Sequence, residues 1–239
     1  MIYTLRISRR KLGEAESYWQ SFSYETEKKE DTVASALTRL NEEEDLRDTE
    51  GKPARRITWE RSCLQKKCGA CAMVINGRPG LACDARLAEL GGSTIRLEPL
   101  RKFPVVEDLR VDRSILMRNL AEMRLWLTKN AELHDEDQEL AYMASECIQC
   151  GCCLEICPNF YAGGRFFGMA VVPVTTRLLT ELPKESYRAI AEEYARHSFA
   201  GCGKSLACRD ICPRGIDTEE LLVNANAMAV WKRKRKKKK

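Results

Sequence analysis

The chain has 239 residues, 31% of them charged and 44% hydrophobic, so it is long enough for one or two domains with a buried core. It contains no run of 18 or more apolar residues, and its first residues lack the apolar core of a signal peptide, so we expect neither a membrane-spanning helix nor secretion. In the reducing interior of a cell, its 12 cysteines are better explained as metal ligands than as disulfide partners.

The net charge of +5 comes from one end of the chain. Residues 232–239 are all Lys or Arg and contribute +8, which leaves −3 for the rest. We expect this block to be a disordered, solvated tail, with attraction to anionic lipid headgroups as the functional alternative. Because the rest of the chain offers no basic groove or regularly spaced stacking aromatics, we expect no nucleic-acid partner.

The first part of the chain is predicted to be rich in strands. Strand patterns occupy residues 2–8, 19–27, 71–83 and 93–100. The first two segments are expected to pair antiparallel, and Asn76-Gly77 predicts a hairpin within the third. Apolar residues three and four positions apart predict a helix with one buried face within 31–42.

The second part is predicted to be helical. Two helical stripes consist of Leu116, Leu120, Met123 and Leu127, and of Tyr187, Ile190, Ala191 and Tyr194. Asp217 and Glu220 resemble a capping box ahead of a helix over 221–231. Strand-like alternation is nearly absent after about residue 105. We therefore predict an α+β chain with a sheet-rich domain over 1–105, a helical domain over 106–231 and the tail over 232–239.

Four cysteines in the first domain have the spacing of a two-iron ferredoxin. Cys63, Cys68 and Cys71 stand at C-x4-C-x2-C and Cys83 follows, which is the plant-type pattern for a [2Fe–2S] cluster. The loop must bring backbone N–H groups close to the sulfurs, and Gly69 permits that approach. Zinc is the main rival, but structural zinc usually uses two C-x2-C pairs and only one is present here.

A longer cysteine frame occurs twice in the second domain. The first copy has the bacterial-type spacing C-x2-C-x2-C-x3-C-P, with its cysteines at Cys147, Cys150, Cys153 and Cys157. The second copy, residues 202–213, keeps three of the four: Cys202, Cys208 and Cys212. Ser205 stands where its second cysteine should be.

In two-cluster ferredoxins the fourth cysteine of each run binds the other cluster. We therefore predict a [4Fe–4S] cluster on Cys147, Cys150, Cys153 and Cys212. The other site receives Cys157, Cys202 and Cys208, and with Ser205 at its vacant corner it most simply holds a [3Fe–4S] cluster. A serine-ligated four-iron cluster is the alternative, although a hydroxyl is a poorer ligand than a thiolate for this metal. Cys152 lies outside the frame and is expected to be a buried packing residue or a spare ligand.

Other chemistry is not visible in the sequence. His134 and His197 lie in polar helical stretches without a partner at metal spacing, and the chain has no P-loop, no GxGxxG and no Ser/His/Asp arrangement. We therefore expect stations for single electrons and no catalytic residues.

The order of these motifs resembles the iron–sulfur subunit of succinate dehydrogenase and fumarate reductase. The resemblance rests on residues 61–83, 98–112, 147–158 and 202–213 and covers the chain up to Trp231. It implies a β-grasp [2Fe–2S] ferredoxin domain followed by an α-helical ferredoxin domain. It also implies two partners, an FAD-containing subunit that interconverts succinate and fumarate and a membrane anchor that handles quinone. The chain is then expected at the cytoplasmic face of the membrane as a peripheral electron-transfer subunit.

Two positions depart from that family. Where many members have a Trp and a His that help to form a quinone pocket, this chain has Ala162 and Gly203, with Phe160 and Tyr161 as the nearest aromatics. The chain is thus similar to the branch whose anchor carries haem and binds quinone farther away.

Two other functions are compatible with parts of the sequence. The same electron relay can serve another flavoenzyme, such as a thiol-linked fumarate reductase, although such systems often carry tandem CCG-type repeats that this chain lacks. A zinc-stabilised basic binding protein is an alternative of a different class, and it predicts a colourless protein that chelators unfold.

Overall fold

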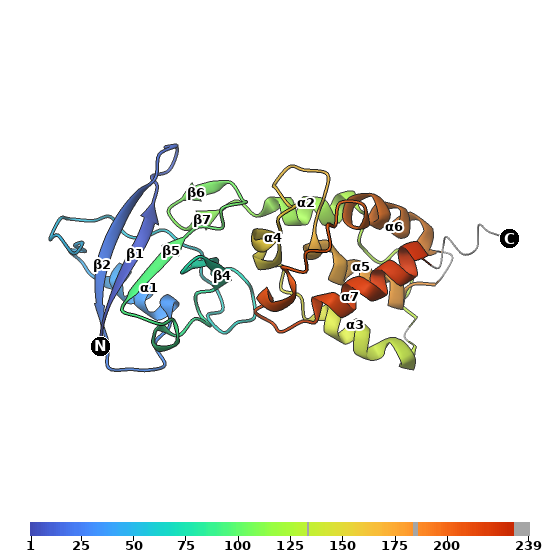
Figure 1. The fold of residues 1–239 in the computed structure, drawn as a ribbon, viewed down its shortest axis with the longest axis horizontal. Helices are drawn as coiled ribbons and strands as arrows, with labels where there is room; N and C mark the ends of the chain where they lie inside the picture. The colour runs from blue at the N-terminus through green and yellow to red at the C-terminus, as the bar shows by residue number, and fades with distance from the viewer. Residues whose placement is uncertain (133, 184–185, 232–239) are drawn as a thin grey trace. The chain divides into compact units, whose positions relative to one another are not determined.

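The computed structural model describes residues 1–132, 134–183 and 186–231. The chain divides into two compact units, Met1–Asp112 and a second unit that begins at Arg113 (Figure 1). The predicted tail, 232–239, lies outside the described residues.

The first unit is built on a five-stranded mixed sheet with the order β2-β1-β5-β3-β4. Its strands are β1 (Ile2–Arg9), β2 (Tyr18–Glu25), β3 (Ala72–Ile75), β4 (Arg78–Leu81) and β5 (Thr94–Glu98). The pairs β1–β2, β3–β4 and β3–β5 are antiparallel, whereas β1–β5 is parallel. The predicted strands and the antiparallel pairing of the first two are thus confirmed. Alternate residues such as Leu5, Ile7 and Phe22 are fully buried, which is the pattern of a sheet with one face on the core.

Helix α1 (Val33–Glu42) lies beside this sheet, as Figure 1 shows. Its predicted apolar face is buried, and Thr32 caps the helix by accepting a hydrogen bond from the Ser35 N–H. The predicted hairpin is also confirmed, because Asn76 and Gly77 both have positive φ and join β3 to β4. A mixed sheet with one helix beside it is the arrangement expected of a β-grasp domain.

A short hairpin, β6 (Val105–Glu107) and β7 (Arg110–Val111), belongs to the first unit. The boundary expected at residue 105 cuts through this hairpin, whereas the structure divides after Asp112. The physical reason is Asp108, whose buried carboxylate contacts Arg9 Nε at 3.1 Å and Arg55 Nη2 at 2.6 Å. It also accepts hydrogen bonds from the Arg10 and Thr58 N–H groups, so the hairpin is fastened to β1 and to the loop that follows Pro53.

The second unit is helical. Its α-helices are α2 (Ser114–Glu122), α3 (Gln138–Ser145), α4 (Cys152–Ile156), α5 (Val172–Glu181), α6 (Tyr187–Tyr194) and α7 (Thr218–Asn226). Shorter helical turns are η2 (Asp135–Asp137), η3 (Met169–Val171), η5 (Ala195–Phe199), η6 (Arg209–Ile211) and η7 (Ala227–Trp231). Helix α5 packs against α3, α6 and α7. In their shared core Tyr194 is fully buried and donates a hydrogen bond to Asn226 Oδ1 at 2.8 Å.

Two predicted features of this unit are confirmed and one is wrong. Helix α6 buries Ile190, Ala191 and Tyr194, and Asp217 caps α7 by accepting from the Glu220 N–H. The stripe that was expected to reach Leu127 ends earlier, because α2 stops at Glu122 and Leu127 is exposed.

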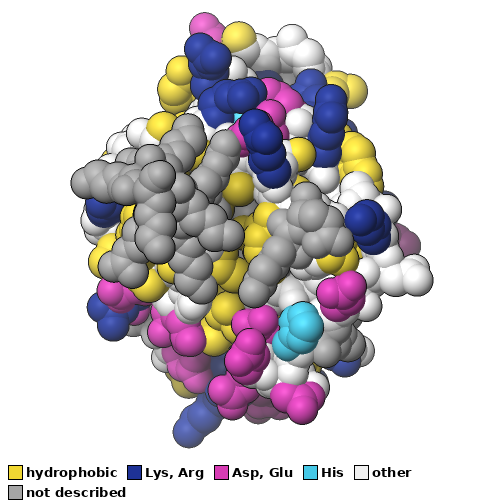
Figure 2. All heavy atoms as spheres, turned by 90° about the vertical axis from the view of Figure 1, so that its right-hand side faces the viewer, with side chains coloured by type: hydrophobic (Ala, Val, Ile, Leu, Met, Phe, Trp, Pro, Cys, Tyr) yellow, Lys and Arg dark blue, Asp and Glu magenta, His cyan; other side chains and the backbone are white. Residues whose placement is uncertain are grey.

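The described part of the second unit exposes large apolar side chains: Met117, Trp126, Leu127, Tyr142, Tyr161, Val223 and Trp231. Figure 2 shows hydrophobic side chains at the surface of one face of this unit, with acidic side chains gathered on one side of them. Within residues 1–132, 134–183 and 186–231, no helix combines the length and the apolar character needed to cross a membrane.

Candidate iron–sulfur centres

The loop around Cys63 and Cys68 points backbone N–H groups at sulfur atoms. Cys63 Sγ accepts from the N–H groups of Gln65 and Lys67 at 3.3 and 3.4 Å. The Lys66 N–H donates to Cys83 Sγ at 3.4 Å, and the Ala70 N–H donates to Cys68 Sγ at 3.5 Å. Such donors stabilise negative charge on sulfur, as a cluster that carries four thiolates requires.

The backbone of this loop explains how the donors reach the sulfurs. Leu64, Lys66 and Gly69 all have φ between 52° and 74°, so the chain reverses its curvature repeatedly and turns its N–H groups inward. Gly69 adopts this conformation without cost, as expected from the sequence. Lys66 also forms an ion pair with Asp84, at 2.7 Å, beside the loop.

The four thiols of the first unit lie together. Cys63 lies close to Cys68, and Cys71 lies close to Cys83. The N–H donors of Gln65 and Lys67 lower the pKa of Cys63 to about 7, whereas burial raises the pKa of Cys71 to about 12. The four thiols of the first unit therefore differ in character: Cys63 ionises readily, whereas Cys71 is buried and ionises with difficulty.

In the second unit, one cavity is lined by four thiols from both cysteine frames: Cys147, Cys150, Cys153 and Cys212. This is the set that the sequence analysis assigned to one four-iron cluster. Burial raises the pKa of Cys147 to about 11, and a hydrogen bond from Cys152 lowers the pKa of Cys150 to about 7. Arg113 Nη1 also donates to the Cys150 carbonyl oxygen at 3.3 Å and brings positive charge to this edge of the cavity.

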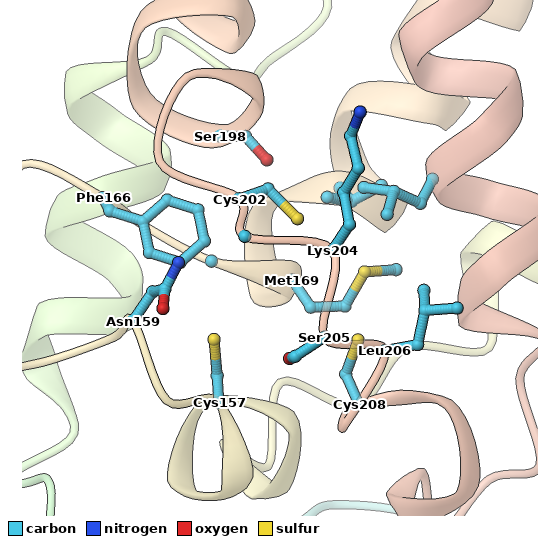
Figure 3. A pocket seen from close by; sticks show the side chains of 14 residues that line it. Cys157, Asn159, Phe166, Met169, Ser198, Cys202, Lys204, Ser205, Leu206 and Cys208 are labelled. Carbon is cyan, nitrogen blue, oxygen red and sulfur yellow. The ribbon is translucent and has the colours of Figure 1, made fainter.

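A second cavity is lined by Cys157, Cys202 and Cys208 together with Ser205. Figure 3 shows the three sulfurs and the Ser205 hydroxyl oxygen pointing into the same space. Burial raises the pKa of Cys208. The set predicted for the three-iron site thus surrounds one cavity, with the serine among the cysteines.

The two frames repeat each other in backbone conformation as well as in sequence. Gln149 and Gly151 have φ of 50° and 88°, and their counterparts Lys204 and Leu206 have φ of 56° and 53°. Three of these four residues are not glycine, so each adopts a conformation that L-residues usually avoid. Because the flanking turns match, Ser205 occupies the position in its frame that Cys150 occupies in the first.

Four other positions singled out from the sequence lie outside the two ligand sets. Cys152 is fully buried and in contact with Cys150. His197 is buried, stacks on Phe167 and has Nδ1 2.8 Å from the Arg165 carbonyl oxygen, and His134 precedes η2. At Gly203 a β-carbon would come within 2.8 Å of Asn159 Nδ2, so a larger residue at this position would require Asn159 to move.

The side chains present fit iron–sulfur clusters. Their donors are soft thiolates, and each cavity gathers three or four of them from separate segments. Among the described residues, no three His, Cys, Asp or Glu side chains converge closely enough to hold a single metal ion. Ligands of a cluster need not converge in that way, because they are distributed over several iron atoms.

The sequence analysis missed Gln149, whose side-chain amide contacts Cys147. It also missed Asn159, which donates to the Gly201 carbonyl oxygen at 2.8 Å beside the three-thiol cavity. Neither residue is a cysteine of the recognised frames, and their contacts with the Ala170 and Gly201 carbonyl oxygens join segments that are distant in the sequence.

Comparison with known proteins agrees with the division of the chain into two units. Residues 4–118 match the family model of a 2Fe-2S iron-sulfur cluster binding domain, and residues 143–216 match that of a 4Fe-4S dicluster domain. The chain is 36% identical to the succinate dehydrogenase iron-sulfur subunit of Bacillus subtilis over 71% of this chain and 70% of that protein. It is 31% identical to the fumarate reductase iron-sulfur subunit of Mycobacterium tuberculosis over 67% and 69% of the two chains.

A solved structure shares the fold. A chain of the Mycobacterium smegmatis Sdh1 complex in the apo form superposes with a TM-score of 0.71 at 21% identity, over 95% of both chains. At this identity the likeness shows the fold alone, an α+β arrangement with a sheet domain followed by a helical one.

Proposed function

Because the chain belongs to the family of succinate dehydrogenase and fumarate reductase iron–sulfur subunits, we propose that it relays single electrons between an FAD-containing subunit and membrane quinone. The relay uses three clusters. A [2Fe–2S] cluster is held by Cys63, Cys68, Cys71 and Cys83. A [4Fe–4S] cluster is held by Cys147, Cys150, Cys153 and Cys212. A [3Fe–4S] cluster is held by Cys157, Cys202 and Cys208.

The observation that carries this proposal is the pairing of the two cavities in the second unit. Each is lined by cysteines of both frames, in the combination that separate four-iron and three-iron clusters require. Met169 lines both cavities, so at that point one side chain separates them. Such proximity suits electron transfer between two clusters.

The same proposal names the partners and the location. An FAD-containing subunit would deliver or accept electrons at the first unit. A membrane anchor that binds quinone, with or without haem, would exchange electrons with the second unit. The exposed aromatic side chains Trp126, Tyr142 and Trp231 support a protein partner on the second unit, because large apolar groups at a surface favour contact with other proteins. The chain then lies at the cytoplasmic face of the membrane and holds no catalytic residues itself.

The test is metal and sulfide analysis with EPR on the complex purified without oxygen. We expect about nine iron atoms per chain, acid-labile sulfide, a three-iron signal in the oxidised state and a two-iron signal after reduction. Zinc without sulfide would refute the proposal and favour a zinc-stabilised binding protein. Fumarate reduction by thiols, with no activity toward quinols, would instead identify a thiol-linked fumarate reductase.

A further inference from the structure

One residue of the first frame that is not a cysteine contacts a sulfur of the four-thiol cavity. Gln149 Nε2 lies 3.3 Å from Cys147 Sγ and 3.0 Å from the carbonyl oxygen of Ala170 in η3. It lines the same cavity as the four cysteines. The amide thus links a cysteine of the first frame to the turn that precedes α5.

The orientation of this amide follows from its neighbours. A thiolate sulfur and a carbonyl oxygen are both acceptors, so the NH2 end of the amide must face them. Gln149 Oε1 is then buried and has no hydrogen-bond partner among the described residues. An orphaned buried oxygen is unfavourable, as is the left-handed backbone of Gln149. Neither feature is explained by packing alone.

We propose that Gln149 sets the reduction potential of the four-iron cluster by donating a hydrogen bond to the Cys147 thiolate. The inference rests on the proposed function, because it requires a cluster on Cys147. Reduction adds negative charge that is shared by the ligand sulfurs, so a donor at Cys147 Sγ stabilises the reduced form more than the oxidised form. Gln149 therefore raises the potential, as a tuning residue that takes no part in catalysis.

The second frame provides an internal comparison. Lys204 occupies the position of Gln149 and has nearly the same φ, 56° against 50°. Its side chain is exposed, and among the contacts of the described residues none joins it to Cys202, the counterpart of Cys147. The same backbone turn therefore supports two different side-chain roles, and only Gln149 turns inward to a sulfur.

The experiment is an EPR-monitored redox titration of the purified complex, with Gln149→Met and Gln149→Asn. Methionine keeps the volume without a donor, whereas asparagine keeps the amide and tolerates left-handed backbone but is too short for the contact. In both variants we expect the reduction equilibrium constant of the four-iron cluster to fall by about tenfold, equivalent to about 59 mV for a one-electron couple. The two-iron midpoint should not move.

Lys204→Met is the matched control, because it removes the equivalent side chain of the other frame. It should leave the four-iron midpoint at the wild-type value. A four-iron midpoint that stays unchanged in both Gln149 variants, with clusters present, would overturn the inference alone. Wild-type protein without iron and sulfide would instead overturn the proposed function, so the two failures are distinguishable.

Discussion

Ser205 decides what its cavity can hold. Its hydroxyl points into the space surrounded by three thiols, from the position that Cys150 occupies in the other frame (Figure 3). A neutral hydroxyl is a poor ligand for iron compared with a thiolate, so a fourth iron at that corner lacks a strong protein ligand. The surrounding backbone nevertheless keeps the shape of a complete frame.

We therefore expect Ser205→Cys to convert the three-iron site to a four-iron site. The local turns already match those around Cys150, so the added sulfur needs no backbone change. The oxidised-state three-iron EPR signal should disappear, the iron content should rise by about one per chain, and the potential of this site should fall. Ser205→Ala is the control and should keep the signal. Persistence of the signal in the cysteine variant would mean that residue 205 is not at the open corner.

At the level of single residues, the spacing of the cysteines is the feature that indicates which of them share a site. The cysteine spacing predicted which thiols line which cavity, because C-x2-C-x2-C turns the chain around one centre. It could not predict Gln149, whose contact depends on a left-handed backbone and on Ala170 from another segment. Nothing in the sequence between Cys147 and Cys150 indicates that the Gln149 side chain contacts a sulfur.

Among the helices, α2 shows why the periodicity of a sequence overestimates length. The predicted stripe includes Leu127, but Arg124 has a φ of 55° and ends the helix. The Arg124 N–H bonds to the Ala121 carbonyl oxygen and the Leu125 N–H to that of Leu120, which together form a Schellman motif. Because arginine rarely adopts left-handed backbone, the sequence carried no signal for this end.

This helix end gives a stability prediction. Arg124→Gly should stabilise the second unit by about 0.5–1 kcal/mol, because relief of left-handed strain outweighs the added freedom of the unfolded chain. Arg118→Gly makes the same change at an exposed position inside α2 and should destabilise by about 1 kcal/mol. Denaturant unfolding of the two variants measures both values. Shifts of the same sign would show that Arg124 is not strained in solution.

The β6–β7 hairpin shows a similar limit for the first unit. Its strands are too short for alternation to be visible in the sequence, and its place in the fold depends on Asp108 bonding to Arg9 and Arg55. These partners lie far apart in the chain. The sequence therefore predicted the type of each domain, whereas the exact residue of the division depends on tertiary ion pairs.

For the whole molecule, the arrangement of ligands predicts which clusters depend on which segment. All four proposed two-iron ligands belong to the first unit, and the other seven belong to the second. Within the second unit, Cys157 of the first frame lines the three-iron cavity, and Cys212 of the second frame lines the four-iron cavity. The two frames are thus interdependent, whereas each unit supplies all the proposed ligands of its own clusters.

Three substitutions test this arrangement in the intact complex. Cys157→Ser should remove the three-iron EPR signal and spare the four-iron signal, and Cys212→Ser should do the reverse, because each thiol serves the cluster of the opposite frame. Cys68→Ser should affect only the two-iron signal, since its ligands come from a separate unit. If each frame served its own cluster, the first two results would be exchanged. The expected results would mean that neither frame can hold a complete cluster without the other. Helix packing must then bring the two frames together before either site is formed.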